Sequence, residues 1–212
     1  MSDVIAQALL KIGAVGFRPD DPITFKSGIL SPVYVDNRQL PYHPVAWRAV
    51  IEGFAGLIEQ HRIDYDVIAG VAVGGVPHSS ALAYHLQAQS VFVRKQAKEH
   101  GKSRRVEGGD VAGKTVLLIE DLVTTGGSSL SGVQALRAEG AAVTDVLAIV
   151  SYGFEEADKH FHDAGITLHT LTNFRVIMKH ALQMQLLHET HATKINDWFT
   201  DPHGWASRHR DK

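Results

Sequence analysis

The chain has 212 residues, no cysteine and a formal net charge of −2, with 44% hydrophobic and 21% charged residues. These values are typical of a single globular domain, which we expect to extend over residues 1–212. They argue against a general nucleic-acid binder, a membrane-spanning segment and a disulfide framework. Because the first residues also lack a basic and apolar leader, we expect a cytoplasmic protein.

Residues 1–40 predict a small N-terminal hood. Its first apolar residues have the spacing of an amphipathic helix, with Ser2 or Asp3 available as the cap; they are Val4, Ile5, Ala8, Leu9 and Ile12. Two short extended segments, 23–25 and 32–37, bracket the sequence KSGILS, which predicts a hairpin or an irregular turn. The hood stands outside the regular pattern that follows, and we expect it to cap one edge of the fold.

Residues 41–212 predict an α/β core and C-terminal helices. The first helix of this part has a wide apolar face, formed by Trp47, Val50, Ile51, Phe54, Leu57 and Ile58. From residue 66 onward, strand-like and helix-like segments alternate. The expected strands lie at 66–73, 90–93, 115–119, 142–152 and 166–171, and the expected helices at 75–86, 128–140, 154–165 and 173–190. This pattern indicates an open, parallel, twisted sheet flanked by helices, with ligands at the carboxyl ends of its strands.

The segment VLLIEDLVTTGGSSL, residues 116–130, carries the strongest functional signal. A strand is followed by an acidic pair, a glycine-rich turn and a helix. Backbone N–H groups and hydroxyls at a helix start favour a phosphate, and here they come from Thr124, Thr125, Gly126, Gly127, Ser128 and Ser129. Glu120 and Asp121 repel phosphate, so they need hydroxyl groups, a metal ion or a developing positive charge. A phosphorylated sugar supplies both kinds of partner.

A basic segment at 94–105 contains six of the 21 Lys and Arg residues and one acid, Glu99. The rest of the chain carries a net charge of −7. Such a local excess of positive charge is directed at an anion. Gly101, with Gly108 and Gly109 beyond the segment, would let it act as a lid that closes when the anion binds.

Residues 116–130 resemble the phosphoribosyl diphosphate-binding motif of the type I phosphoribosyltransferases, in which four apolar residues, two acids and a turn of small residues recur. FKSGILSPVYVDNR at 25–38 and RKQAKEHG at 94–101 resemble the orotate phosphoribosyltransferases. The resemblance extends from Phe25 to the last helix. It implies the type I phosphoribosyltransferase fold. It also implies the transfer of a phosphoribosyl group from phosphoribosyl diphosphate to orotate, giving orotidine 5'-monophosphate and diphosphate in pyrimidine biosynthesis.

The resemblance also implies roles for individual residues. Catalysis would involve Lys98, His100 and Asp121, with His100 as the proton donor to the diphosphate. Phosphoribosyl diphosphate would be bound by Arg94, Lys95, Lys98, His100, Glu120, Asp121, Leu122, Val123, Thr124, Thr125, Gly126, Gly127 and Ser128. Orotate would be bound by Lys26, Arg38 and Thr124. Arg38 takes the place of an arginine that several family members carry after the strand that ends here in SY.

Three further expectations come with the resemblance. Mg²⁺ is expected as the partner of the diphosphate, held by substrate oxygens and water, so no protein ligands are assigned. A homodimer is expected, in which the 94–105 loop of one subunit closes the site of the other. Residues 70–77 correspond to the diphosphate loop of the family, and Gly74 stands where some members have a lysine, so backbone N–H groups would carry more of the binding.

Two other functions remain open from the sequence. A phosphoribosyltransferase for another base would keep residues 116–130 but lack the hood and the basic loop seen here. A non-catalytic regulator could keep the sugar-phosphate site to sense its ligand or to bind RNA. Such a regulator needs a basic exposed face outside the site, and the acidic remainder of the chain argues against one.

Three patterns resemble functional motifs, but their sequence context argues against those functions. Residues 108–115 match a nucleotide-binding P-loop, but a strand follows the match instead of preceding it, so Gly113 and Lys114 predict a turn. The histidines of HETH at 188–191 lack the spacing of a zinc-binding helix. The aromatic residues near the C-terminus predict packing or a subunit interface in preference to base stacking; they are Trp198, Phe199 and Trp205.

Overall fold

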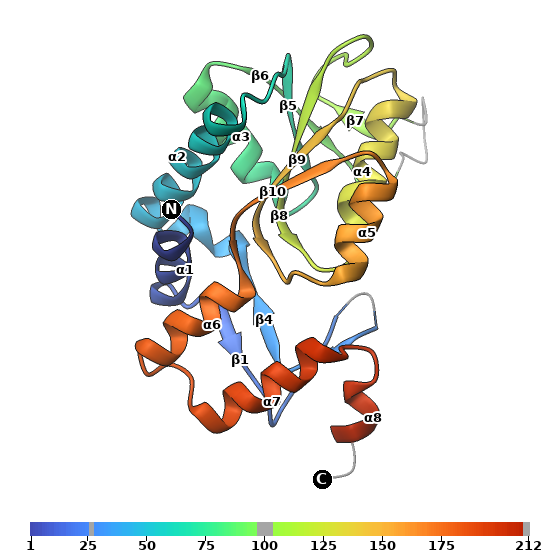
Figure 1. Ribbon diagram of the computed structural model, residues 1–212. Helices are drawn as coiled ribbons and strands as arrows, with labels where there is room; N and C mark the ends of the chain where they lie inside the picture. Colours follow the sequence, from blue (N-terminus) through green and yellow to red (C-terminus); the bar gives the residue numbers. More distant parts are fainter. Residues whose placement is uncertain (26–27, 97–103, 210–212) are drawn as a thin grey trace.

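The computed structural model describes residues 1–25, 28–96 and 104–209. The described residues form a six-stranded sheet with the strand order β10-β9-β8-β5-β6-β7 (Figure 1). Its strands are β5 (Val67–Val71), β6 (Gln89–Val93), β7 (Val106–Glu107), β8 (Val116–Val123), β9 (Asp145–Ser151) and β10 (Thr167–Asn173). All neighbours pair in parallel except β6 and β7. The parallel sheet is therefore confirmed, and the two-residue edge strand β7 was not predicted.

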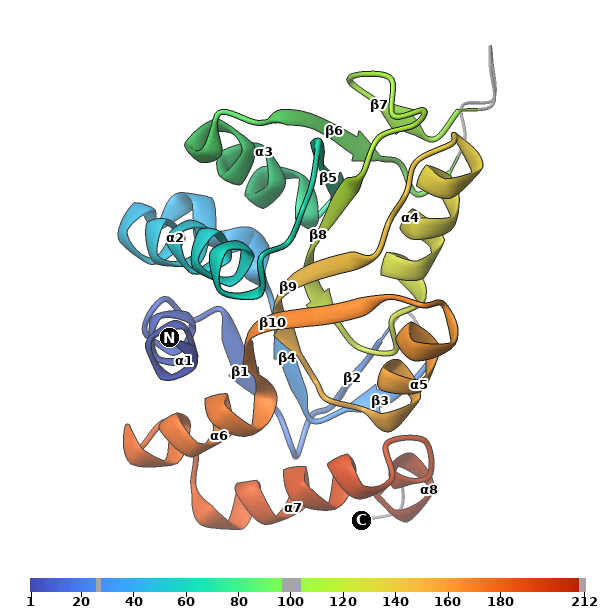
Figure 2. The same cartoon turned by 45° about the horizontal axis from the view of Figure 1, so that its top comes forward.

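Helices cover both faces of this sheet, as its strands require, because β5 and most of β8 and β9 are buried along their length (Figure 2). One face carries α1 (Ser2–Lys11), α2 (Pro44–His61) and α3 (Gly75–Leu86). The other face carries α4 (Gly127–Ala138) and α5 (Glu155–Asp163). The helices expected at 75–86, 128–140 and 154–165 therefore form close to their predicted bounds. No helix of the described residues is long and apolar enough to cross a membrane.

The expected side-chain cap of α1 is wrong. Ser2 and Asp3 lie inside the helix, which has Met1 as its N-cap residue and no capping side-chain hydrogen bond. Their side chains instead join α1 to distant elements. The Ser2 hydroxyl donates to Oγ1 of Thr172 at 3.0 Å, and Oδ1 of Asp3 lies 2.7 Å from Nε2 of His180. Because the Ser2 and Asp3 side chains bond to residues distant in the sequence, they do not cap the helix.

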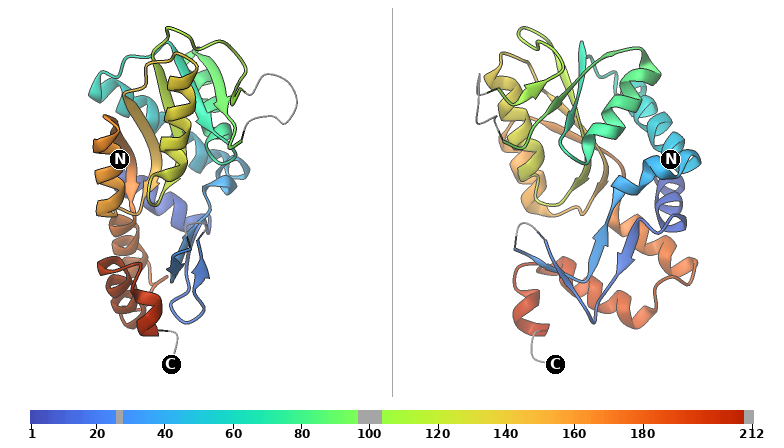
Figure 3. Two further views of the ribbon diagram at one scale, coloured as in Figure 1. Left: turned by 90° about the vertical axis from the view of Figure 1, so that its right-hand side faces the viewer. Right: turned by 180° about the vertical axis from the view of Figure 1, so that it is seen from behind.

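The hood strands form two antiparallel pairs. The first joins β1 (Val15–Phe17) to β4 (Val33–Val35), and the second joins β2 (Ile23–Thr24) to β3 (Leu30–Ser31). A hairpin does form here, but β2 pairs with β3, which lies inside the expected turn at 26–31. The second expected segment, β4, pairs instead with β1, which was not predicted. A 3₁₀ helix, η1 (Asn37–Tyr42), follows β4 and leads into α2. These short strands lie beyond the carboxyl ends of the large sheet (Figure 3).

The single helix expected at 173–190 is wrong. Strand β10 extends to Asn173, whose Oδ1 caps the next helix by accepting from the N–H of Val176 at 3.0 Å. That helix, α6, ends at Gln183, and Gln185 has a left-handed backbone with φ of 58°. The C-terminal residues form α6 (Phe174–Gln183), α7 (Glu189–Thr200) and α8 (Trp205–His209). The apolar residues at 173–190 keep helical spacing, so this spacing did not reveal the cap at Asn173 or the turn at Gln185.

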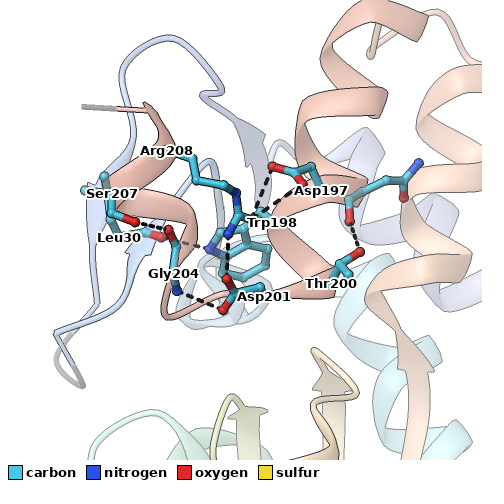
Figure 4. Close-up of polar contacts among 9 residues, drawn as sticks. Leu30, Asp197, Trp198, Thr200, Asp201, Gly204, Ser207 and Arg208 are labelled. Carbon is cyan, nitrogen blue, oxygen red and sulfur yellow. Dashed lines mark hydrogen bonds and ion pairs between the residues drawn. The ribbon is translucent and has the colours of Figure 1, made fainter. Parts of the chain in front are cut away.

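Helix α7 packs against the hood strands and is hydrogen-bonded to one of them. The buried Trp198 donates from Nε1 to the carbonyl oxygen of Leu30 at 2.8 Å (Figure 4). The Arg208 side chain donates to Asp201 at 2.5 Å and lies 3.4 Å from Asp197, which ties α8 to α7. The expected packing of the C-terminal aromatic residues is therefore confirmed.

Candidate active site

Two adjoining cavities lie where the hood meets the carboxyl ends of β5, β6 and β8. The larger has a volume of about 1180 Å³ and the smaller about 500 Å³. Both are lined by Phe25, Ala72, Lys95, Gln96, Leu122, Thr124 and Ser128. The position agrees with the rule that open parallel sheets bind ligands outside their carboxyl edge.

The smaller cavity surrounds the glycine-rich turn between β8 and α4. Its wall contains every predicted residue of that turn, namely Val123, Thr124, Thr125, Gly126, Gly127 and Ser128. Gly126 is the N-cap residue of α4 with φ of 83°, and a Cβ atom there would lie 2.9 Å from the Phe161 ring. No side chain caps α4. The first residues of the helix therefore lie at the cavity without a capping side chain, an arrangement that suits an anion.

The two carboxylates of β8 both line the larger cavity, but their surroundings differ. The strand continues through them to Val123, beyond the expected end at 119. Glu120 is only 3% exposed, and it accepts from the Ser129 hydroxyl at 3.3 Å and from the N–H of Asp121 at 3.1 Å. Burial, together with the adjacent Asp121 charge, raises the pKa of Glu120 well above its ordinary value. Asp121 is half-buried and remains the more accessible carboxylate.

Two neighbours fix Asp121 in the cavity wall. The Asn37 side chain is fully buried and donates from Nδ2 to the backbone carbonyl oxygen of Asp121 at 2.6 Å. On the other side, Gly74 leaves room for the carboxylate, because a Cβ atom on Gly74 would overlap all three carboxyl atoms. The position of Asp121 thus depends on a residue of η1 and on the loop after β5.

A buried histidine lies behind this wall. Nδ1 of His78 accepts from Nε1 of Trp47 at 3.0 Å, so the proton of the neutral ring is on Nε2. Nε2 is buried and has no hydrogen-bond partner among the described residues. Burial lowers the pKa of His78 to about 4, although the nearby Asp121 charge opposes the shift. His78 is therefore neutral at physiological pH.

The described basic residues of the predicted site lie around the cavities. Arg94 and Lys95 follow β6 and line the larger one, and Lys95 and Arg105 line the smaller one. Arg38 lines the larger cavity, but its guanidinium donates to both carboxylate oxygens of Asp36, at 2.6 and 3.0 Å. This pairing raises the pKa of Arg38. Lys26, Lys98 and His100 lie outside the described residues.

Aromatic side chains form a wall of the larger cavity that the sequence did not reveal. Phe25, Tyr34 and Tyr152 line it, and the rings of Phe25 and Tyr152 lie 5.4 Å apart. Trp198 supports both rings from behind, at 6.1 Å from Phe25 and 5.8 Å from Tyr152. An apolar wall of this kind suits a planar base. Only the position of Phe25 next to the KSGILS segment could have indicated it.

The comparisons with known proteins agree with this geometry. The family model for the phosphoribosyl transferase domain matches residues 38–177. An orotate phosphoribosyltransferase of Coxiella burnetii is 39% identical over 201 residues, covering 95% of this chain and 96% of the relative. One from Bacillus caldolyticus is 38% identical over 98% of this chain and 100% of the relative. The chain belongs to the orotate phosphoribosyltransferase family.

Solved structures of the same family share the fold. The orotate phosphoribosyltransferase of Aeropyrum pernix has a TM-score of 0.74 and 28% identity, covering 87% of this chain and 99% of that one. The Mycobacterium tuberculosis enzyme in complex with 5-phospho-α-D-ribosyl 1-diphosphate has a TM-score of 0.64 and 26% identity, over 82% and 98% of the two chains. The predicted type I phosphoribosyltransferase fold is confirmed.

The P-loop match at 108–115 and the histidines at 188–191 have structural explanations. Gly113 has φ of 71° and precedes β8, so the P-loop match is a turn, as predicted. His191 lies 3.3 Å from Asp20, and its ring lies 6.1 Å from that of His188. No group of three or more metal-ligating side chains occurs among residues 1–25, 28–96 and 104–209.

Proposed function

We propose that this protein transfers the 5-phosphoribosyl group from phosphoribosyl diphosphate to orotate, forming orotidine 5'-monophosphate and diphosphate in UMP biosynthesis. One observation carries the proposal: an uncapped helix start, a carboxylate pair and an aromatic wall line two adjoining cavities. These surfaces match a phosphate, a ribose and a planar base in that order. Relatives at 38–39% identity that carry the name orotate phosphoribosyltransferase support the choice of base.

The charges of the site fit the transition state of this reaction. The bond from ribose C1 to the diphosphate breaks while the bond to the base nitrogen forms, so positive charge develops on the sugar ring. A carboxylate beside the ribose and cations beside the diphosphate stabilise that distribution. We assign the first role to Asp121, with Glu120 holding the turn through Ser129. We assign the second to Arg94, Lys95, Lys98 and His100, with His100 donating a proton to the departing diphosphate.

Orotate would lie against the aromatic wall with its carboxylate toward the hood. Arg38 lines this cavity, and its pairing with Asp36 makes it a preformed but partly neutralised cation. Lys26, next to Phe25 in the sequence, is the second proposed partner of the carboxylate, and Thr124 is the proposed contact between base and sugar sites. Arg38→Gln tests this assignment, because it should raise KM for orotate more than KM for phosphoribosyl diphosphate.

Mg²⁺ is the proposed cofactor, bound to the diphosphate. The donors available fit a cation that arrives with the substrate, because Asp121 is the half-buried carboxylate in the wall that no described arginine pairs with, and the described residues offer no protein cage. Bound there, Mg²⁺ would neutralise part of the charge on the diphosphate. Orotate turnover in excess EDTA, restored by added Mg²⁺, tests the requirement.

We also propose a homodimer in which the 94–105 loop of one subunit serves the site of the other. Large apolar side chains are exposed on α2, on α3 and on the turns that precede them, namely Tyr42, Val45, Val73 and Tyr84. Val73 also lines the larger cavity, so this surface adjoins the site. Such exposure is typical of an interface.

Mixing two inactive variants tests the shared site. If the loop acts across the interface, a heterodimer of Lys98→Ala and Asp121→Asn subunits has one intact site, and random exchange restores about a quarter of wild-type activity. Activity that stays at the level of the separate variants would contradict the sharing of the loop.

The reaction itself is tested by the loss of orotate absorbance. Protein, phosphoribosyl diphosphate, Mg²⁺ and orotate are mixed, with uracil, adenine and hypoxanthine as parallel substrates. We expect turnover with orotate alone. Preference for another base would reassign the substrate, and binding of phosphoribosyl diphosphate without any turnover would favour a regulator. We place the reaction in the cytoplasm, because both substrates are anions that do not cross a bilayer unaided.

A further inference from the structure

Arg105 is held rigidly in the wall of the smaller cavity. Its Nε donates to the carbonyl oxygen of Arg94 at 2.8 Å. Its Nη1 donates to the carbonyl oxygen of Ser131 at 3.1 Å and to the Ser131 hydroxyl at 3.0 Å. Ser131 belongs to α4 and lines the same cavity as the start of that helix. The guanidinium is thus fixed beside the turn at 124–128 by three hydrogen bonds.

All of these acceptors are neutral oxygens, which distinguishes Arg105 from its neighbours. Among the described residues, Arg38 pairs with Asp36. In the same way, Arg94 lies 3.6 Å from Glu107 and Arg104 lies 2.8 Å from Glu139. No carboxylate pairs with the Arg105 side chain in the described part of the chain. A partly buried cation without a counter-charge is stabilised when a ligand brings one.

We infer that Arg105 binds the 5'-phosphate of phosphoribosyl diphosphate together with the first turn of α4. The inference rests on the proposed function, and it places Arg105, the last residue of the basic segment, in the site of its own subunit, at the end opposite the diphosphate. The planar guanidinium still has its Nη2 group for a phosphate oxygen, and it matches phosphate geometry better than an ammonium group does. The helix start contributes backbone N–H groups and its dipole to the same anion.

A purely structural role for Arg105 is the competing explanation. The residue also joins the two ends of the basic loop, because its backbone carbonyl oxygen accepts from the N–H of Arg94 at 2.8 Å. A structural role would alter loop position and stability, and with them the binding of diphosphate. A phosphate-binding role affects ribose 5-phosphate and leaves diphosphate binding intact. The two explanations therefore differ in which end of the substrate they affect.

The test compares Arg105→Gln and Arg105→Lys with the wild type by titration calorimetry, using ribose 5-phosphate and diphosphate as separate probes. Arg137→Gln is the matched control. Arg137 lies in the last turn of α4. Like Arg105, it donates to backbone carbonyl oxygens, those of Ala164 and Val143, but it lines neither cavity. Thermal unfolding of all variants reports whether they fold.

We expect Arg105→Gln to weaken ribose 5-phosphate binding about tenfold or more, as for the loss of a charged hydrogen bond, and to change diphosphate binding less than about twofold. Arg105→Lys should recover part of the loss, and Arg137→Gln should bind both probes like the wild type. Equal weakening of both probes, or unchanged ribose 5-phosphate binding by a folded Arg105→Gln protein, would overturn the inference. Because these titrations need no orotate, their result is independent of the base assignment.

Discussion

The carboxylate of Asp121 fills the space into which a side chain at position 74 would project. The Asp121 carboxylate therefore requires a glycine at position 74. The backbone angles do not, because a φ of −65° suits any residue. A side chain here and the present position of the Asp121 carboxylate exclude each other.

Gly74→Ala should displace Asp121 and lower turnover by about 10²-fold, the usual cost of removing one group that stabilises a transition state. The loss should appear in kcat more than in KM for orotate, because the role proposed for Asp121 is beside the sugar. Steady-state kinetics measure both. Gly56→Ala is the control, because a Cβ atom there would meet only the tip of Met1. Wild-type kinetics for Gly74→Ala would show that the Asp121 position is not critical.

Glu120→Gln should change how stability depends on pH. Because the pKa of Glu120 is raised in the folded protein, the folded state binds the proton more tightly than the unfolded state does. Stability from this residue is therefore present below the ordinary glutamate pKa and is lost as the pH rises through the raised value. Relative to wild type, Glu120→Gln should gain stability as the pH rises above the ordinary glutamate pKa of 4.5. Urea unfolding measures this difference, and the exposed Glu52→Gln should give none.

His78 should give the opposite dependence. Its pKa of about 4 lies below the ordinary value of 6.5, so the unfolded chain binds the proton more tightly. Stability from His78 is present above pH 6.5 and is lost as the pH falls toward 4, with about 2 kcal/mol lost between pH 7 and pH 5. Unfolding of His78→Asn should lack this loss, while His85→Gln, an exposed histidine on the same helix, should retain it. The same loss in His78→Asn as in wild type would contradict the assignment.

Trp198→Phe should loosen the base side of the cavity. It removes the donor to Leu30 and part of the surface behind Phe25 and Tyr152. We expect a loss of about 1–3 kcal/mol in the free energy of unfolding, together with a higher KM for orotate. KM for phosphoribosyl diphosphate is the internal control, because Trp198 does not line the cavity around the turn at 124–128. An equal rise in both KM values would argue against a specific effect on the base.

The wall of the smaller cavity could be predicted because most of its residues are adjacent in the sequence. Strand, carboxylates, turn and helix start all lie within residues 116–130, and local rules describe such a segment well. The aromatic wall of the larger cavity could not, because it depends on contacts such as that between Phe25 and Trp198, which are 173 positions apart. Periodicity also gave no sign that α6 would end at Gln183, or that Arg105 would bond to Ser131.

The contact between the hood strands and α7 has a consequence for biosynthesis. Translation delivers β2 and β3 well before their buried support, Trp198, which lies on α7 after β10. A nascent chain that has reached β10 already holds every strand of the large sheet. Domains fold as units during synthesis, and this one lacks the support of its aromatic wall until α7 leaves the ribosome. The wall beside Phe25 and Tyr152 is therefore completed only after every strand of the large sheet has been made.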